Sequence, residues 1–232
     1  MPSDRAATAA PQDPSLTQAA TQPATASERP ALAPIRPVEV LPTGAIRTAR
    51  LLLRPLAEDD RAEFIRVLRA SRQHLETFSP LHMPDETDDQ VFERQLSLTI
   101  DGETRGKACR RVVIDREGSI VGACNLNAIR RGLSWEADAN CWLAAGAEGM
   151  GYATEGMVGL LRHAFADLPD GLGLHRIIAW MQTDNTRSER MIERLGFERG
   201  GAEKSFLHAG GQWKLHEKLV MTPEGFAARL AG

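Results

Sequence analysis

A glycine-rich turn between two regular patterns is the stretch best suited to bind a charged ligand. A strand-like apolar run ends at residues 142–144, and a helical pattern begins just after Gly149 and Gly151. Glycine lets the backbone turn sharply and lets a ligand approach without obstruction by a Cβ atom. The helix presents unpaired N–H groups and the positive end of its dipole at this turn. The pattern therefore predicts a phosphate or pyrophosphate site.

Two common phosphate-binding loops do not fit the turn. A Walker A loop ends in Gly-Lys-Ser/Thr, and the chain has no such run. A dinucleotide fingerprint that starts at Gly149 needs a sixth-position glycine, where Thr154 stands. No clear strand ending in an acid follows about twenty residues later, as ribose binding would require.

A second segment about thirty residues farther along completes a different pattern. A strand-like run at residues 176–181 precedes Asn185-x-x-Ser188 and then Leu-Gly-Phe at residues 195–197. Before it, residues 148–153 fit the fourth and sixth positions of Gln/Arg-x-x-Gly-x-Gly/Ala. This order resembles the GNAT acetyltransferases, over roughly residues 46–221, and most of all the branch that acetylates the alanine or serine N-termini of ribosomal proteins.

The resemblance implies a fold and a cosubstrate. The fold is α/β (α+β), with a mixed, mostly antiparallel central sheet of about six to seven strands flanked by about four helices. The cosubstrate is acetyl-CoA, and no metal is expected. The first segment would bind the pyrophosphate and the second would flank the pantetheine arm. The implied cofactor-binding residues are Trp142, Leu143, Ala144, Glu148, Gly149, Met150, Gly151, Tyr152, Ala153, Thr154, Asn185 and Ser188.

Two details of this cofactor site are specific to the chain. The family's strand splays away before the loop, so we expect backbone groups of residues 142–144 to meet the pantetheine and the thioester oxygen. Glu148 stands where glutamine or arginine is expected. A carboxylate pointing inward would repel the diphosphate, so we expect this side chain to face solvent while its N–H contributes to the loop.

Candidate catalytic residues follow from the same resemblance. Asp138 matches an acidic position of the family's strand and is the candidate general base, through a water relay. Glu136 shares its strand face at a period of two and is the direct alternative. Ile192 replaces the tyrosine that many relatives use to protonate the thiolate, which leaves Ser188. A purely structural role remains open for each candidate. Asp138 and Glu136 could be solvent-facing acids, Ser188 could bond to backbone at the helix terminus, and the cofactor-binding candidate Asn185 could be a helix cap.

The predicted reaction is acetyl transfer to a primary amine by direct transfer in a ternary complex. A peptide α-amine, with a free pKa near 7.7–8.0, loses its proton at little cost, whereas a lysine near 10.4 needs more help. A weak or water-relayed base therefore suffices for an α-amine, and the resemblance to the ribosomal-protein branch makes a protein or peptide N-terminus the leading acceptor. A small amine (an amino acid, polyamine or aminoglycoside) is the alternative, and a catalytically silent CoA-binding protein is another.

The acceptor groove is expected beside the first two helices. His74, Phe78, His82 and Met83 are candidates for its lining. An acidic cluster lies nearby and either attracts a basic substrate or only starts a helix. Its members are Asp85, Glu86, Asp88 and Asp89.

Periodicity and turn residues predict the elements that position these groups. Strands are expected at residues 50–55, 111–114, 119–126, 134–143, 176–181, 206–207 and 212–221. Helices are expected at 58–72, 87–99, 154–166 and 185–195.

Composition sets the outer limits. The chain has 232 residues and a net charge of −3, enough for one core domain and without a general surface for nucleic acid. Its apolar runs are too short to span a bilayer. The three cysteines lack metal or redox spacing, which favours reduced thiols in the cytoplasm. Residues 1–43, rich in alanine, proline and threonine, are predicted to be a disordered tail, and 44–232 an acetyltransferase domain, monomeric or homodimeric.

Overall fold

The computed structural model describes residues 44–209 and 212–231, and the predicted tail, residues 1–43, lies outside them. In chain order the elements are β1 (Ile46–Arg47), β2 (Leu52–Arg54), a 3₁₀ turn (Glu58–Asp60), α1 (Arg61–Leu75), α2 (Asp88–Thr104), β3 (Cys109–Ile114), β4 (Ile120–Arg130), β5 (Glu136–Leu143), α3 (Tyr152–Phe165), β6 (Arg176–Gln182), α4 (Thr186–Leu195), β7 (Glu198–Ala209), β8 (Gln212–Met221) and α5 (Pro223–Ala231).

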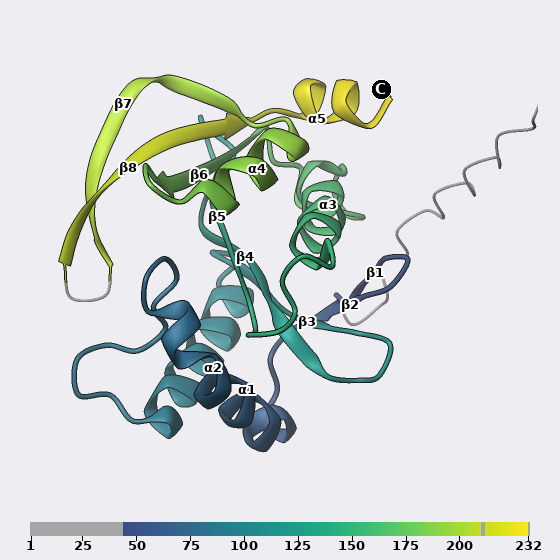
Figure 1. Cartoon of the computed structure of the whole chain (residues 1–232). Coiled ribbons are helices and arrows are strands. Elements are labelled where there is room, and N and C mark those ends of the chain that lie inside the picture. Colours follow the sequence, from purple (N-terminus) through teal and green to yellow (C-terminus); the bar gives the residue numbers. More distant parts are fainter. Residues whose placement is uncertain (1–43, 210–211, 232) are drawn as a thin grey trace, which may run out of the picture. The chain divides into compact units, whose positions relative to one another are not determined.

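One mixed sheet runs through the described residues in the order β1-β2-β3-β4-β5-β6-β8-β7 (Figure 1). Every neighbouring pair is antiparallel except β5 and β6, which are parallel. The predicted mixed, mostly antiparallel sheet is therefore confirmed. Its described strands number eight rather than six or seven, because β1 pairs through only two residues and is too short to give a sequence pattern.

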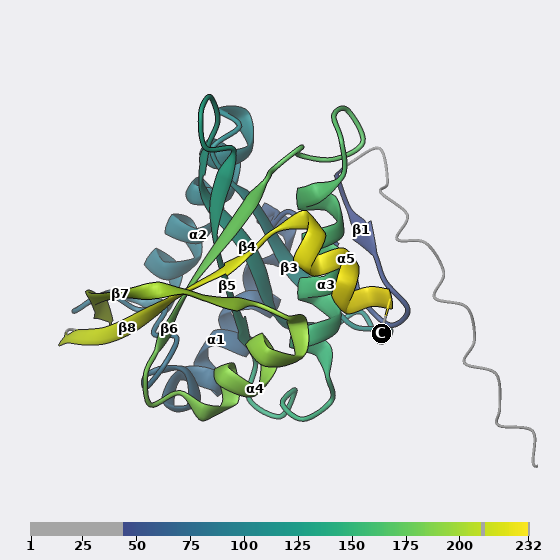
Figure 2. The ribbon, with the colours of Figure 1, turned by 90° about the horizontal axis from the view of Figure 1, so that it is seen from above.

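Helices cover both faces of the sheet (Figure 2). Trp142 of β5 points to one face, where its ring lies 6.1 Å from that of Phe64 on α1. Cys124 of β4 points to the other, where its Sγ lies only 3.0 Å from the position a Cβ on Gly156 of α3 would take. Glycine on α3 thus lets that helix lie close against the strands that lead into the predicted phosphate loop.

The described helices include one that the periodicity did not predict. The helix α5 is short, and its pattern is carried by a single buried aromatic residue, Phe226. That ring packs against Phe165 at the end of α3, with 5.7 Å between ring centroids. The helix is therefore held by tertiary packing, which a short sequence window cannot show.

The second helix was expected over residues 87–99, and α2 starts at Asp88 and continues to Thr104. Thr87 caps α2, since its hydroxyl accepts the Gln90 N–H at 3.3 Å, and the Gln90 side chain accepts the Thr87 N–H at 2.8 Å. This reciprocal pair satisfies two N–H groups that the helix itself leaves free.

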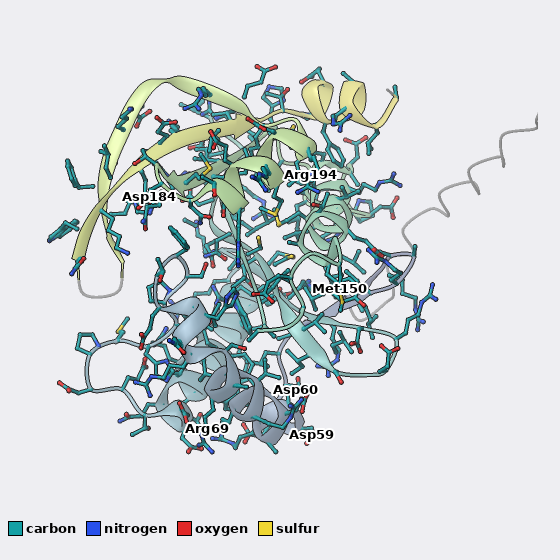
Figure 3. All side chains as sticks on the ribbon, viewed as in Figure 1. Asp59, Asp60, Arg69, Met150, Asp184 and Arg194 are labelled. Atoms are coloured by element: carbon teal, nitrogen blue, oxygen red, sulfur yellow. The ribbon has the colours of Figure 1, made fainter. Side chains whose placement is uncertain are left out.

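A half-buried ion pair fixes the entry into α1. Both Asp60 oxygens accept from Arg54 at 2.7 Å, and one also accepts the Ala57 N–H at 2.9 Å (Asp60 is labelled in Figure 3). Burial alone would raise the pKa of Asp60, but these hydrogen bonds outweigh it and hold that pKa below its ordinary value. A carboxyl with a lowered folded pKa stabilises the fold above its unfolded pKa and loses that contribution as the pH falls through the folded value.

We therefore expect Asp60→Asn to lower the free energy of unfolding by about 2 kcal/mol at pH 7, the size of a charged hydrogen-bond loss. Urea denaturation should show the gap from the wild type closing in acid. Glu58→Gln, which changes an exposed acid in the same turn, is the matched control and should cost much less. A gap that does not narrow as the pH falls would contradict the assignment.

Two further features concern the described ranges as a whole. Within residues 44–209 and 212–231, none of the helices combines the length and apolar character needed to cross a membrane. In the same ranges, no cluster of three or more histidine, cysteine, aspartate or glutamate side chains is arranged to hold a metal ion.

Candidate active site

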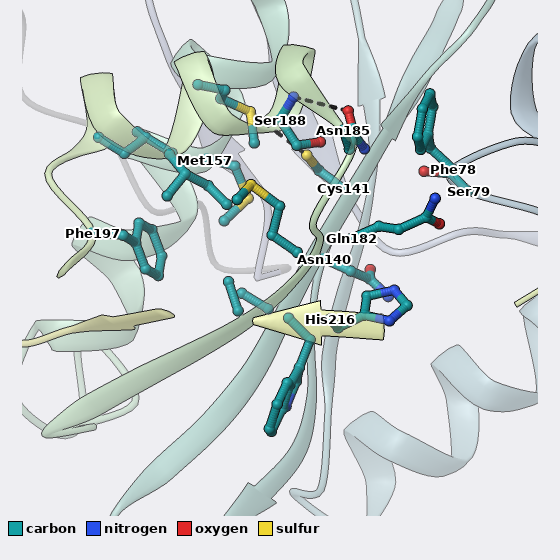
Figure 4. Close-up of a pocket in the computed structure, with 17 residues that line it drawn as sticks. Phe78, Ser79, Asn140, Cys141, Met157, Gln182, Asn185, Ser188, Phe197 and His216 are labelled. Carbon is teal, nitrogen blue, oxygen red and sulfur yellow. Dashed lines mark hydrogen bonds between the residues drawn. The ribbon is translucent and has the colours of Figure 1, made fainter. Parts of the chain in front are cut away.

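The central feature of the candidate site is a splay between β5 and β6. The two strands pair from Glu136–Arg176 as far as Ala139–Ala179. Beyond that point β6 continues beside β8, and β5 continues beside β4. A cavity of about 110 Å³ opens between the separated strands (Figure 4).

This cavity is lined from both faces of the sheet. Cys141 points toward α4, where its Sγ lies 3.8 Å from the sulfur of Met191. Asn140, the preceding residue of β5, points to the opposite face, because strand side chains alternate. Gln182 of β6 and His216 of β8 also line the cavity. The splay is therefore a passage between the α3–α4 side and the α1–α2 side of the sheet.

The backbone of β5 presents polar groups to this passage. The Ala144 N–H donates to the Val121 carbonyl of β4 at 2.9 Å, so it is already used within the sheet. Because N–H directions alternate along a strand, the Leu143 N–H points away from β4, toward the splay. Of the predicted residues 142–144, Leu143 is therefore one whose N–H is directed to the splay rather than to β4.

The glycine-rich loop holds a run of unpaired N–H groups. Gly149 and Gly151 have φ values of 76° and 78°, the left-handed region that glycine favours, and Gly151 is the N-cap of α3. The first bond of the helix runs from the Glu155 N–H to the Gly151 carbonyl. The backbone N–H groups from Gly149 to Thr154 therefore have no acceptor in the part of the chain that the structure describes. Such a concentration of donors at a helix N-terminus is suited to a diphosphate.

Glu148 is only partly turned to solvent: its side chain is 34% exposed, and its carboxylate also contacts the loop. Its carboxylate turns back onto the loop, where one oxygen accepts the Gly146 N–H at 2.7 Å. The other lies 3.1 Å from His74 Nδ1 and 3.6 Å from the Arg187 guanidinium. Hydrogen bonds from its own N–H and from Gly146 are the main reasons that the pKa of Glu148 lies below its ordinary value. An intramolecular anion thus stands beside the free N–H groups.

A second acid anchors the start of α3. Glu155 accepts from the Thr48 hydroxyl at 2.6 Å and from the Arg50 N–H and Nε at 2.7 Å. The Arg50 guanidinium also lies 4.9 Å from the ring centre of Tyr152 and 3.4 Å from the position of a Cβ on Gly151. The β1–β2 turn therefore places a cation beside the loop. Sequence reasoning missed Arg50, because about a hundred residues separate it from the loop.

Asn185 and Ser188 lie together at the start of α4 and line the cavity. The Asn185 side-chain oxygen accepts the Ser188 N–H at 3.1 Å, so the helix-cap role is confirmed (Figure 4). The side chain of Ser188 is half-buried and lies in reach of the cavity. Ile192, in the place of the family's tyrosine, is a buried apolar residue of the same wall.

The two candidate bases are engaged elsewhere. Asp138 is held by Arg130 through two hydrogen bonds of 3.0 and 3.1 Å. Glu136 accepts from the same arginine at 2.9 Å and from Arg176. Burial would raise the pKa of Glu136, but these two arginines keep it below its ordinary value. Neither acid lines the cavity, so either one reaches an acceptor only through water.

Only one of the four residues predicted to line the acceptor groove lies at the cavity. Phe78 lines it, whereas His74 binds Glu148 and His82 lies 3.0 Å from Asp88. His82 and Met83 instead line a separate, open groove of about 440 Å³ between the α1–α2 connection and β8.

Most of the acidic cluster is neutralised by neighbouring side chains. Arg94 binds Glu86, and Arg69 binds Asp88. Arg61 lies 3.6 Å from Asp89. These ion pairs favour the role of the cluster as the start of α2 over that of an electrostatic attractor.

Comparisons with known proteins point in one direction. The family described as "Acetyltransferase (GNAT) domain" matches residues 50–198. Ribosomal protein uS5-alanine N-acetyltransferase of Escherichia coli (strain K12) is 25% identical over 187 residues, which are 78% of this chain and 92% of that protein.

Solved structures agree on the fold. RimJ of Mycobacterium smegmatis in complex with CoA-disulfide is 26% identical, with a TM-score of 0.69 over 78% of this chain and 88% of that one. Spermidine N-acetyltransferase from Vibrio cholerae, in complex with CoA and spermine, is 21% identical, with a TM-score of 0.62 over 78% and 99% of the two chains. This last likeness shows the fold alone.

Proposed function

We propose, since the chain belongs to the GNAT acetyltransferase family, that it transfers the acetyl group of acetyl-CoA to the N-terminal α-amine of a protein or peptide. The activity of an acetyl-CoA-dependent acyltransferase follows from the family. The acceptor is the proposed part. Its support is the similarity to a uS5-alanine N-acetyltransferase over 78% of this chain.

The observation that carries the cofactor assignment is the run of free N–H groups from Gly149 to Thr154 beside the β5–β6 cavity. These donors would bind the diphosphate, with Arg50 adding a positive charge. The passage would take the pantetheine arm on the α3–α4 side. The Leu143 N–H would stabilise the negative charge that develops on the thioester oxygen.

The leaving thiolate needs a proton donor on the same side. Ser188 is the side chain of α4 that could donate this proton, because it carries a hydroxyl and lines the cavity. Asn185 caps the helix end on which Ser188 lies. Direct transfer within a ternary complex suits a passage with the thioester on one side and the amine on the other.

The test is product analysis with defined acceptors. The full chain is incubated with acetyl-CoA and equal amounts of a tetrapeptide beginning with alanine, one beginning with serine, spermidine and free alanine. Mass spectrometry should find the acetyl group on a peptide α-amine. Products confined to spermidine or free alanine would replace the peptide by a small amine. Acetyl-CoA binding without any product would support the catalytically silent alternative.

A further inference from the structure

One buried acceptor atom in the β5–β6 cavity lacks a donor. Gln182 is only 7% exposed and lines the cavity. Its Nε2 donates to Asp184 Oδ1 at 2.6 Å, and because a carboxylate oxygen only accepts, this contact fixes which end of the amide is the oxygen. Gln182 Oε1 is completely buried and has no hydrogen-bond partner among the described residues. A buried carbonyl oxygen without a donor costs free energy, which a ligand N–H would recover.

A histidine with a defined tautomer lies beside it. His216 of β8 is the cross-strand partner of Gln182 and is 8% exposed (Figure 4). Its Nδ1–H donates to the carbonyl of Lys214 at 2.8 Å, since a carbonyl can only accept. In the neutral ring Nε2 is then the nitrogen with a lone pair.

The charged groups around this histidine leave that lone pair available. On its own strand, Lys214 Nζ donates to the Thr77 carbonyl at 2.7 Å, and Lys218 Nζ binds Glu203. Glu217 points to the other face of the hairpin, where it binds Arg199 and Lys204. Just after β6, Asp184 accepts from Gln182 Nε2.

Within the cavity lining itself, the other ionisable side chain is the Cys141 thiol. Burial raises the pKa of the Cys141 thiol to about 11, so it stays protonated at neutral pH. His216 is therefore the basic group of the cavity.

We propose that Gln182 Oε1 and His216 Nε2 together bind the acceptor amine, and that His216 is the catalytic base. This inference rests on the acetyl-transfer function. A primary amine has two N–H groups when neutral, one for each acceptor. As its nitrogen forms the new C–N bond, the C–S bond breaks and the electron pair leaves on sulfur. His216 Nε2 takes one amine proton and passes it to solvent. The Ser188 hydroxyl donates a proton to the thiolate.

The position of the pair supports this assignment over the acids of β5. Asn140, Gln182 and His216 lie on the face of the sheet opposite Cys141 and Ser188, so amine and thioester would approach from opposite sides of the passage. Asp138 lies outside the cavity and is bound by Arg130. A base must lie within hydrogen-bond reach of the proton it takes, or one water away.

The first experiment compares three variants of the full chain: His216→Gln, Asp138→Asn and, as the control, His175→Gln at an exposed surface position. Single-turnover acetylation of the alanine-terminated tetrapeptide and of spermidine is followed from pH 5.5 to 9.5. We expect His216→Gln to slow the step about a hundredfold at pH 7, with acetyl-CoA affinity unchanged within twofold. The loss should shrink toward pH 9, where more of the amine arrives deprotonated.

Two further measurements distinguish a catalytic His216 from a merely structural one. Added imidazole should restore a measurable part of the rate of His216→Ala. Gln182→Leu should raise the KM for the amine about tenfold and change kcat less. If Asp138→Asn shows the hundredfold loss and the altered pH profile while His216→Gln does not, the proposal is overturned.

A second measurement separates this proposal from the choice of acceptor. Nitrogen-15 NMR of the histidine rings, with His216 assigned from its Gln variant, reports which ring nitrogen carries the proton. We expect the Nδ1–H form, and a shift of Nε2 when methylamine is titrated into the acetyl-CoA complex. A proton on Nε2 in the neutral ring would refute the proposal, whichever amine is acetylated. Suppose instead that the Nδ1–H form and the methylamine shift are present but neither the tetrapeptide nor spermidine is acetylated. That result would count against the acceptor named in the proposed function and not against the role of His216.

Discussion

Gly151→Glu is expected to weaken acetyl-CoA binding by at least a hundredfold. Gly151 is the exposed N-cap of α3, with a φ of 78°, and stands within the run of free N–H groups. A carboxylate introduced there would accept those N–H groups itself and would lie within reach of Arg50. It would therefore occupy the donors and cation that we assign to the diphosphate, and like charges would repel. Isothermal titration calorimetry with acetyl-CoA and with CoA measures the loss.

The control for this variant must carry the same backbone strain elsewhere. Gly118, in the β3–β4 turn, has a φ of 83°, and a Cβ there would meet no atom within 4 Å. Gly118→Glu should therefore destabilise the fold about as much as Gly151→Glu, since both force a left-handed conformation on a residue with a side chain. It should bind acetyl-CoA normally. A folded Gly151→Glu variant with normal affinity would show that the loop is not the phosphate site.

The loop and its helix could be predicted from the sequence because the signals are local. Glycine spacing, an apolar strand before the loop and a helical pattern after it lie within about twenty residues. The same holds for Asn185, whose capping bond reaches only three residues along the chain. The family resemblance predicted a mixed sheet, and the parallel pair among its described strands is β5 and β6, with α3 as the crossover between them.

The polar groups at the splay could not be predicted, because strand register decides them. Gln182 and His216 are cross-strand partners, and no periodicity in either segment shows that alignment. The same limit applies to Asp138. Its sequence position resembles a family acid, but Arg130 lies on the paired strand β4 and binds it there. An acid that the sequence of one strand presents as a free base is thus paired with an arginine on the neighbouring strand.

The partners of the partly exposed Glu148 side chain could not be predicted for a related reason. From the sequence alone, solvent was the reasonable place for a carboxylate beside a predicted diphosphate. The structure supplies partners from two other helices, His74 of α1 and Arg187 of α4, together with the Gly146 N–H. These contacts hold the partly exposed carboxylate at the loop, and we propose that it competes there with an anionic ligand.

Glu148→Arg is therefore expected to tighten acetyl-CoA binding about a hundredfold. Removing the carboxylate relieves repulsion and frees His74 and Arg187 to contact the diphosphate. This part should tighten binding about tenfold, and Glu148→Gln should show this tenfold effect without the rest. The guanidinium adds a charged hydrogen bond of about 1.5 kcal/mol or more, which corresponds to another tenfold. Calorimetry at 50 mM and 500 mM salt should show the gain shrinking as charges are screened.

Glu117→Arg makes the same change of net charge at an exposed position of the β3–β4 turn, outside the loop itself. It should leave affinity within about twofold, which isolates the local effect from the field of the whole protein. If Glu148→Arg and Glu148→Gln both weaken binding, the carboxylate is needed to shape the loop through Gly146, and its contact there is part of the cofactor site rather than a competitor. Tightening in both variants, in the predicted order, would place the diphosphate within reach of residue 148.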